Sequence, residues 1–94
     1  MGVPVEVRHL PRDGRFEAIV EGRCCRLDYL LDAGVMTIHH TEVPSELEGR
    51  GIAAELTRVA IDHARANGLM VRPLCGYARA WLHRHPEQAD LVAR

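Results

Sequence analysis

The apolar residues of this chain change their spacing near residue 50. Before that point, four segments alternate between apolar and polar residues, as strands with one buried face do. After it, apolar residues recur at intervals of three and four, which is typical of an amphipathic helix. The pattern predicts strands over residues 3–10, 15–21, 23–31 and 35–43, followed by a helix over residues 50–66.

Short turns separate the four predicted strands. Segments 11–14, 21–22 and 32–34 contain the Gly and Asp residues that favour tight reversals. Strands joined so closely pair side by side in opposite directions, so we expect an antiparallel meander. The residues expected to share the buried face of the third strand are Cys25, Leu27, Tyr29 and Leu31.

A second, shorter unit follows the long helix. Asn67 and Gly68 are suited to end that helix, and residues 69–74 then form a short strand of the buried type. Because a helix precedes this strand, we expect it to run parallel to the strand before the helix. Residues 76–85 are predicted to form a second helix, and residues 87–94 a polar tail. The fold class is α+β, with the order ββββαβα.

Length and composition limit the classes of protein that are compatible with the chain. Its 94 residues are enough for one domain, residues 1–94. No apolar run approaches the roughly 18 residues that a membrane span needs. Residues 1–6 lack the basic and apolar parts of a signal peptide, so we expect a cytoplasmic protein that does not act at a membrane.

The charged residues are balanced. The 12 basic residues, all arginine, face 13 acidic residues, which gives a net charge of −1. Such a chain has no general basic field, so we do not expect a nucleic acid as partner. The three cysteines contain no CxxC pair, and adjacent Cys24 and Cys25 cannot readily bond to each other, so we expect reduced thiols.

For the oligomeric state, we expect a monomer or a weak dimer.

Gly49 and Gly51 lie just before the long predicted helix. Glycines at a helix start leave several backbone N–H groups unpaired, and the helix dipole adds positive charge there, so this place suits a phosphate or pyrophosphate. Alternatively, Ser45 and Glu48 fit a capping box that would start the helix at Glu46. Each glycine would then cost about 0.8–1 kcal/mol in the first turns.

The segment from Glu48 to Ala53 resembles the [Gln/Arg]-x-x-Gly-x-[Gly/Ala] coenzyme A signature of the GNAT superfamily of acetyltransferases, and Glu48 departs from its first position. In that family the signature follows the fourth strand and opens the central helix, as it does here. Residues 40–44, Pro73-x-Cys75 and His85-Pro86 also resemble a short single-domain branch that lacks the first two helices. The resemblance covers residues 5–92 and implies a GNAT-like mixed sheet.

This resemblance implies acetyl-CoA as the cofactor. The pantetheine arm would pair with the main chain near Glu42 and Val43, in a gap between the fourth and fifth strands. Arg79 and Arg84 on the last helix are candidates to meet the adenosine 3′-phosphate. The residues expected to form the pyrophosphate loop are Gly49, Arg50, Gly51, Ile52, Ala53 and Ala54.

Cys75 is the first candidate for catalysis. It follows the fifth strand and precedes a helix start, where the pKa of a thiol is lowered. It could act as a nucleophile for the acetyl group, as a general acid for the departing coenzyme A thiolate, or only as a packed side chain. Tyr77 is an alternative general acid, because many relatives carry a tyrosine near this position, or else an aromatic residue of the core.

The general base for an incoming amine would be His39, His40 or Glu42. On a regular strand, His39 and His40 face opposite sides, so only one can face the thioester. We select His40, which belongs to the matching segment. The six histidines show no spacing typical of a metal site, so no metal is expected.

Three other groups of residues have structural interpretations. Trp81 and Leu82 are expected in the core, and Leu91 and Val92 are candidates to dock the tail. Cys24 and Cys25 are expected to be structural residues of a strand.

Two functions are therefore considered. The first is an N-acetyltransferase that moves the acetyl group of acetyl-CoA to an amine of a small molecule, a peptide or a protein. The alternative is a non-catalytic module that binds or senses coenzyme A.

Overall fold

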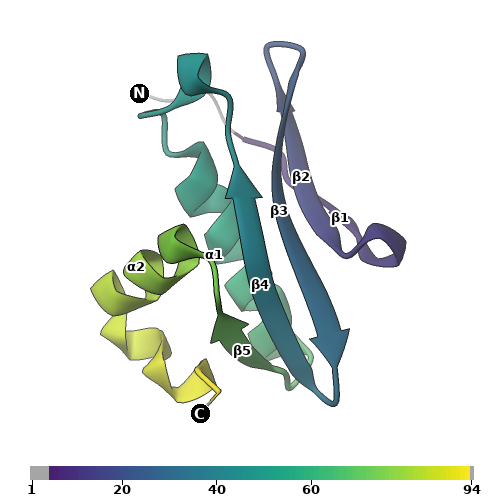
Figure 1. Cartoon of the computed structure of the whole chain (residues 1–94), viewed down its shortest axis with the longest axis vertical. Coiled ribbons are helices and arrows are strands. Elements are labelled where there is room, and N and C mark those ends of the chain that lie inside the picture. Colours follow the sequence, from purple (N-terminus) through teal and green to yellow (C-terminus); the bar gives the residue numbers. More distant parts are fainter. Residues whose placement is uncertain (1–4, 94) are drawn as a thin grey trace.

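The computed structural model describes residues 5–93, which form one five-stranded sheet covered by two helices (Figure 1). The strands lie in the order β1-β2-β3-β4-β5; the first four pair antiparallel, and β4 and β5 pair parallel. The predicted α+β class and the antiparallel meander are confirmed. The strands are β1 Arg8–Leu10, β2 Arg15–Val20, β3 Arg23–Asp32, β4 Val35–Glu42 and β5 Met70–Pro73.

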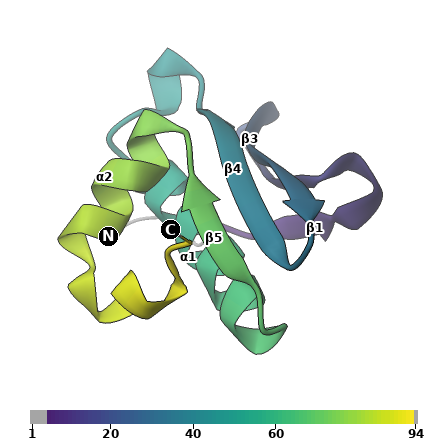
Figure 2. The ribbon, with the colours of Figure 1, turned by 60° about the horizontal axis from the view of Figure 1, so that its bottom comes forward.

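Both helices lie on the same face of the sheet (Figure 2). Helix α1, Ile52–Ala66, packs across β2, β3, β4 and β5, and helix α2, Gly76–Arg84, packs beside it against β4 and β5. Three short 3₁₀ turns complete the described chain: Pro11–Asp13, Ser45–Leu47 and Pro86–Leu91. Over the described residues, the opposite face of the sheet has no helix packed on it.

One continuous core fills the space between the sheet and the helices. Trp81 and Leu82 belong to it with 4% and 7% exposure, so their prediction is confirmed. The strands contribute Phe16, Ala18, Cys25, Leu27, Tyr29, Met36, Ile38 and Val71, and α1 contributes Ile52, Leu56, Ala60, Ile61 and Ala64.

Some predicted boundaries differ from the observed ones. Strand β1, Arg8–Leu10, is shorter than the expected strand over residues 3–10. Residues 3 and 4 lie outside the described residues, as do four of the six residues on which the expectation about a signal peptide rests. Leu31 is 57% exposed although its partner Met36 is buried, because it lies one pair from the turn that joins β3 to β4. The capping-box start at Glu46 is wrong, because Gly51 interrupts the helical backbone with φ of 81°.

The C-terminal segment is not simply a polar tail. Its residues form the 3₁₀ turn Pro86–Leu91, and Leu91 is buried with 7% exposure. Val92 bridges to Val71 of β5, and the N–H of Ala93 donates to the carbonyl oxygen of Val71 at 2.7 Å. The expected docking of Leu91 and Val92 is confirmed.

Candidate functional site

Strands β4 and β5 separate halfway along β4. Their pairing ends at the Ile38–Pro73 pair. The N–H groups of Leu74 and Cys75 both donate to the carbonyl oxygen of Ile38, at 3.0 Å each, and β5 goes no further. Strand β4 continues to Glu42, so its edge beyond Ile38 has no β5 partner. This edge is open to an extended ligand that pairs with main chain.

A β-bulge lies in β4 at the point of this separation. Asp28 pairs with His40 and Tyr29 pairs with Ile38, so His39 is one residue more than β3 can match. Both His39 and His40 are exposed. The expectation that these two histidines face opposite sides is wrong, because the extra residue interrupts the alternation of the strand.

The bulge brings Thr41 to the face that the helices cover. Thr41 pairs with Leu27, which is fully buried on that face. His40 and Glu42 lie on the other face, where His40 Nε2 is 3.1 Å from Glu42 Oε1. Regular alternation after buried Ile38 would have directed His40 inward and Thr41 outward. Thr41 is a site residue that the sequence analysis missed.

A pocket of about 440 Å³ opens between the end of β4, the start of α1 and the start of α2. Within it, β4 and the residue after it contribute Thr41 and Val43, and α2 contributes Tyr77. The remaining lining residues are Glu48, Gly49, Gly51, Ile52, Ala53 and Ala54. Six expected cofactor residues therefore line one pocket. Glu42, Arg50 and Arg79 are not among the lining residues.

The start of α1 presents unpaired N–H groups to this pocket. The first helical bond is donated by Glu55 to the carbonyl oxygen of Gly51. No side chain caps this end, and the N–H groups of Ile52, Ala53 and Ala54 have no backbone acceptor within the described chain. Together with the positive end of the helix dipole, they form a site suited to an anion.

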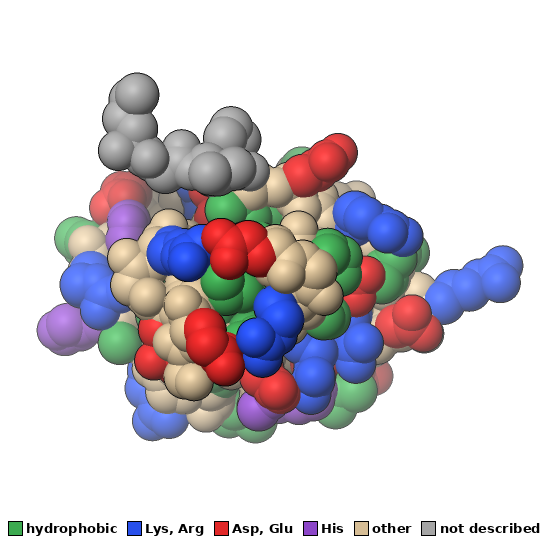
Figure 3. Space-filling model, turned by 90° about the horizontal axis from the view of Figure 1, so that it is seen from above, with side chains coloured by type: hydrophobic (Ala, Val, Ile, Leu, Met, Phe, Trp, Pro, Cys, Tyr) green, Lys and Arg blue, Asp and Glu red, His purple; other side chains and the backbone are tan. Residues whose placement is uncertain are grey.

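The loop before α1 is held to the β2–β3 turn by two ion pairs. Arg50 pairs with Glu21 at 2.5 Å, and Arg23 pairs with Glu46 at 3.2 Å. Figure 3 shows acidic and basic side chains next to one another at this end of the molecule. The Arg50 side chain therefore braces the loop, while its main chain continues into the helix start.

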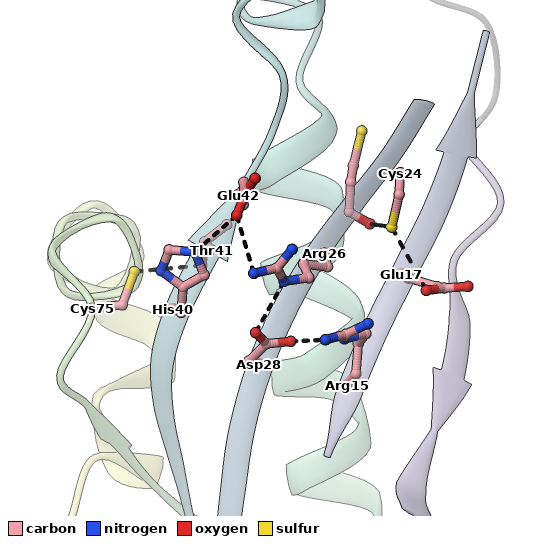
Figure 4. Close-up of polar contacts among 10 residues, drawn as sticks. Arg15, Glu17, Cys24, Arg26, Asp28, His40, Thr41, Glu42 and Cys75 are labelled. Carbon is pink, nitrogen blue, oxygen red and sulfur yellow. Dashed lines mark hydrogen bonds and ion pairs between the residues drawn. The ribbon is translucent and has the colours of Figure 1, made fainter. Parts of the chain in front are cut away.

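Cys75 lies directly before α2, with its sulfur 3.4 Å from Thr41 Oγ1 (Figure 4). Burial raises the pKa of this thiol, but hydrogen bonding from the Thr41 hydroxyl and the N–H groups of Ala78, Tyr77 and Thr41 outweighs burial and lowers the pKa overall.

The thiols of the other two cysteines have raised pKa values. Cys24 is exposed, but partial desolvation of its sulfur, followed by the charge of Glu17, raises its pKa. Burial also raises the pKa of Cys25, which lies in the core. Among the three cysteines, only Cys75 has a lowered pKa.

A polar network crosses the uncovered face of the sheet next to the site (Figure 4). Asp28 accepts from Arg15 Nε at 2.9 Å and from Arg26 Nε at 3.0 Å, and Arg26 Nη2 is 3.1 Å from Glu42. Burial raises the pKa of Asp28, but the hydrogen bonds from Arg15 and Arg26 outweigh it and lower the pKa. The network orients Glu42, which in turn contacts His40.

Arg79 and Arg84 lie on α2 outside the pocket, at a second depression on the surface. Arg79 Nη2 donates to the carbonyl oxygen of Leu74 at 3.3 Å, and both arginines border a shallow depression with Gly76 and His83. Their proposed contact with a 3′-phosphate stays a prediction.

Two further observations concern residues 5–93. No helix there has the length and apolar content required to cross a membrane. In that same part of the chain, no three His, Cys, Asp or Glu side chains are grouped so as to hold a metal ion.

The fold and the pocket define a class of protein: an α+β domain in which unpaired N–H groups at a helix start lie beside a split in the sheet. The profile of the GCN5-related N-acetyl-transferase family matches residues 15–91. The chain therefore belongs to the GCN5-related N-acetyltransferase family.

Individual relatives agree with this assignment. Protein NATD1 of Bos taurus and of Homo sapiens is 30% identical over 88 residues, which covers 90% of this chain and 78% of each relative. Protein NATD1 of Gallus gallus is 28% identical, with 90% and 80% covered. An NMR structure of a GCN5-like protein from Staphylococcus aureus has the same fold, with a TM-score of 0.74, 24% identity, and 94% and 87% of the two chains covered.

Proposed function

We propose that this chain binds acetyl-CoA and transfers its acetyl group to an amine. The observation that carries the proposal is the set of unpaired N–H groups of Ile52, Ala53 and Ala54, which open into a pocket between the end of β4 and α2. These donors match the oxygens of a pyrophosphate. Membership of the acetyltransferase family supports the identity of the ligand.

The open edge of β4 suits the other end of the same ligand. In the proposed complex, the loop from Gly49 to Gly51 surrounds the pyrophosphate, and the main chain of Glu42 and Val43 pairs with the pantetheine arm. The arm then leads toward Thr41 and Cys75. When bound, acetyl-CoA supplies an activated acetyl group as a thioester.

We assign Cys75 the role of nucleophile, because its lowered pKa favours the thiolate. The thiolate attacks the carbonyl carbon of the thioester, and a new carbon–sulfur bond forms. The bond from that carbon to the coenzyme A sulfur breaks, and coenzyme A leaves with the electron pair and takes up a proton. Tyr77 lines the pocket, and in this proposal its hydroxyl donates that proton to the departing coenzyme A.

His40 and Glu42 serve the second half-reaction in this proposal. An amine that approaches from the uncovered face of the sheet meets this hydrogen-bonded pair first. In this proposal the amine passes through the separation of β4 and β5, which begins after the Ile38–Pro73 pair, and so reaches the acetyl group on Cys75 from the His40 side. His40 accepts the proton of the amine as the amine attacks the acetyl group, and the Cys75 thiolate is released. The uncovered face admits a small amine, a peptide or a protein tail.

Binding is tested with a matched pair of substitutions at Ala53, which lines the pocket in the first turn of α1. Ala53→Glu and Ala53→Gln add side chains of similar size, but only Glu adds negative charge beside the pyrophosphate. We expect calorimetry to show at least about tenfold weaker binding of coenzyme A to the Glu variant than to the Gln variant. Equal affinities would contradict the proposed loop.

Transfer is tested by intact mass after incubation with acetyl-CoA. We expect wild type to gain one acetyl group that an amine then removes, and Cys75→Ala to gain none. Binding without acetylation of Cys75 or of any amine in a panel would instead support the alternative, a non-catalytic module that binds or senses coenzyme A.

A further inference from the structure

Thr41 lies between the pocket and Cys75. Thr41 lines the pocket, and its Oγ1 is 3.4 Å from Cys75 Sγ (Figure 4), whereas Cys75 is not itself a lining residue. A ligand in the pocket therefore meets Thr41 first, and the Cys75 sulfur lies next to the Thr41 hydroxyl.

The position of Thr41 depends on the bulge at His39. Without that extra residue, the alternation that buries Ile38 would turn Thr41 to the uncovered face of the sheet. The bulge also lies where β4 separates from β5, so one irregularity opens the strand edge and turns Thr41 inward. Cys75 is anchored from the other side, because its N–H donates to the carbonyl oxygen of Ile38 at 3.0 Å.

Building on the proposed role of Cys75, we propose that Thr41 is a positioning residue that holds the Cys75 sulfur at the pocket and stabilises its thiolate. In the thiol form, the S–H donates to Thr41 Oγ1. On ionisation, the hydroxyl rotates and donates its own hydrogen to the sulfur. Thr41 keeps its proton throughout, so it takes no part in the bond changes of acetyl transfer.

The lowered pKa of Cys75 agrees with this arrangement. Burial opposes ionisation, and the Thr41 hydroxyl is the strongest of the groups that favour it. The three remaining groups are backbone N–H groups, which side-chain substitution leaves in place. Replacing Thr41 therefore isolates one of the groups that favour the thiolate.

The test compares Thr41→Val, which has nearly the same shape without the hydroxyl, with Thr41→Ser, which retains it. The rate of alkylation of Cys75 by iodoacetamide is measured against pH without coenzyme A, and the modified peptide is resolved by mass spectrometry. We expect the midpoint to rise by about one pH unit in Thr41→Val and to stay near the wild-type value in Thr41→Ser. An unchanged midpoint in Thr41→Val would overturn the proposal.

Two controls separate this inference from others. Cys24, which is exposed on another strand, reports general effects, and its midpoint is expected to be the same in all variants. If Thr41→Val unfolds, Thr41→Ala against Thr41→Ser gives the same contrast. Because no coenzyme A is present, a failure of acetyl transfer contradicts the proposed function alone, whereas an unshifted Cys75 midpoint contradicts the role of Thr41 alone.

Discussion

At the scale of single residues, one extra residue in β4 determines which face of the sheet each of the next three side chains occupies. The bulge at His39 turns Thr41 toward the pocket and leaves His40 and Glu42 on the uncovered face. The same strand thus presents the Thr41 hydroxyl to Cys75 on one side and the hydrogen-bonded His40 and Glu42 on the other.

A second group of titratable residues lies away from this site. His9 Nε2 is 2.6 Å from the Tyr29 hydroxyl, its ring stacks on Phe16 at 4.2 Å, and the ring of His63 is 4.3 Å away. Burial, and then the nearby His63, lowers the pKa of His9 below 6.5. The cluster joins β1 to α1 and favours neutral His9.

We predict that this cluster makes folding sensitive to acid. Because the pKa of His9 is lower in the folded state, its contribution is complete above about pH 6.5 and is lost as the pH falls through the folded-state pKa. Urea denaturation between pH 7.5 and 5.5 measures this loss as a falling free energy of unfolding. His9→Phe retains an aromatic ring and does not titrate, so its free energy should vary less with pH. An equal slope in both proteins would exclude His9 as the cause.

At the scale of elements, the start of α1 depends on a backbone conformation that favours glycine. Gly51 has φ of 81°, and a Cβ there would meet no atom within 4 Å. Gly14 has φ of 62°, but a Cβ there would lie 2.5 Å from the carbonyl oxygen of Tyr29. The two positions share the left-handed conformation and differ in space, so they form a matched pair.

We predict that Gly51→Ala lowers the free energy of unfolding by about 1–2 kcal/mol, the cost of the left-handed conformation alone. Gly14→Ala adds a clash with the backbone, so its loss should reach about 3 kcal/mol or more. Chemical denaturation measures both. A loss at Gly51 as large as that at Gly14 would mean that Gly51 is also sterically confined.

At the scale of the whole molecule, the C-terminal segment adds a buried side chain to the core and hydrogen-bonds to the edge of β5. Leu91 is buried, and the backbone beyond it bonds to Val71 on the outer edge of β5. Arg65 of α1 also pairs with Asp90 at 2.9 Å. Residues 90–93 therefore hold β5 and α1 together.

We predict that Leu91→Ala lowers the free energy of unfolding by about 2–4 kcal/mol, because it leaves a cavity in a small core. Exposed Glu87→Ala, in the same turn, should change it by less than about 0.5 kcal/mol. Thermal and urea unfolding of the two variants provide the comparison. If Leu91→Ala behaved like Glu87→Ala, the segment would not be part of the cooperative core.

Sequence patterns alone predicted the order of the elements, the buried strand faces apart from Leu31, and an uncapped helix start after Gly49 and Gly51. These features are local: alternation, helical spacing and glycine act within a few residues of the chain. Thr41, the exposed Leu31 and the bonding of the last turn to Val71 were not predictable in this way, since each depends on how distant segments pair. The pairing of β3 with β4 creates the bulge at His39, and only the tertiary structure decides which side chain of β4 meets Cys75.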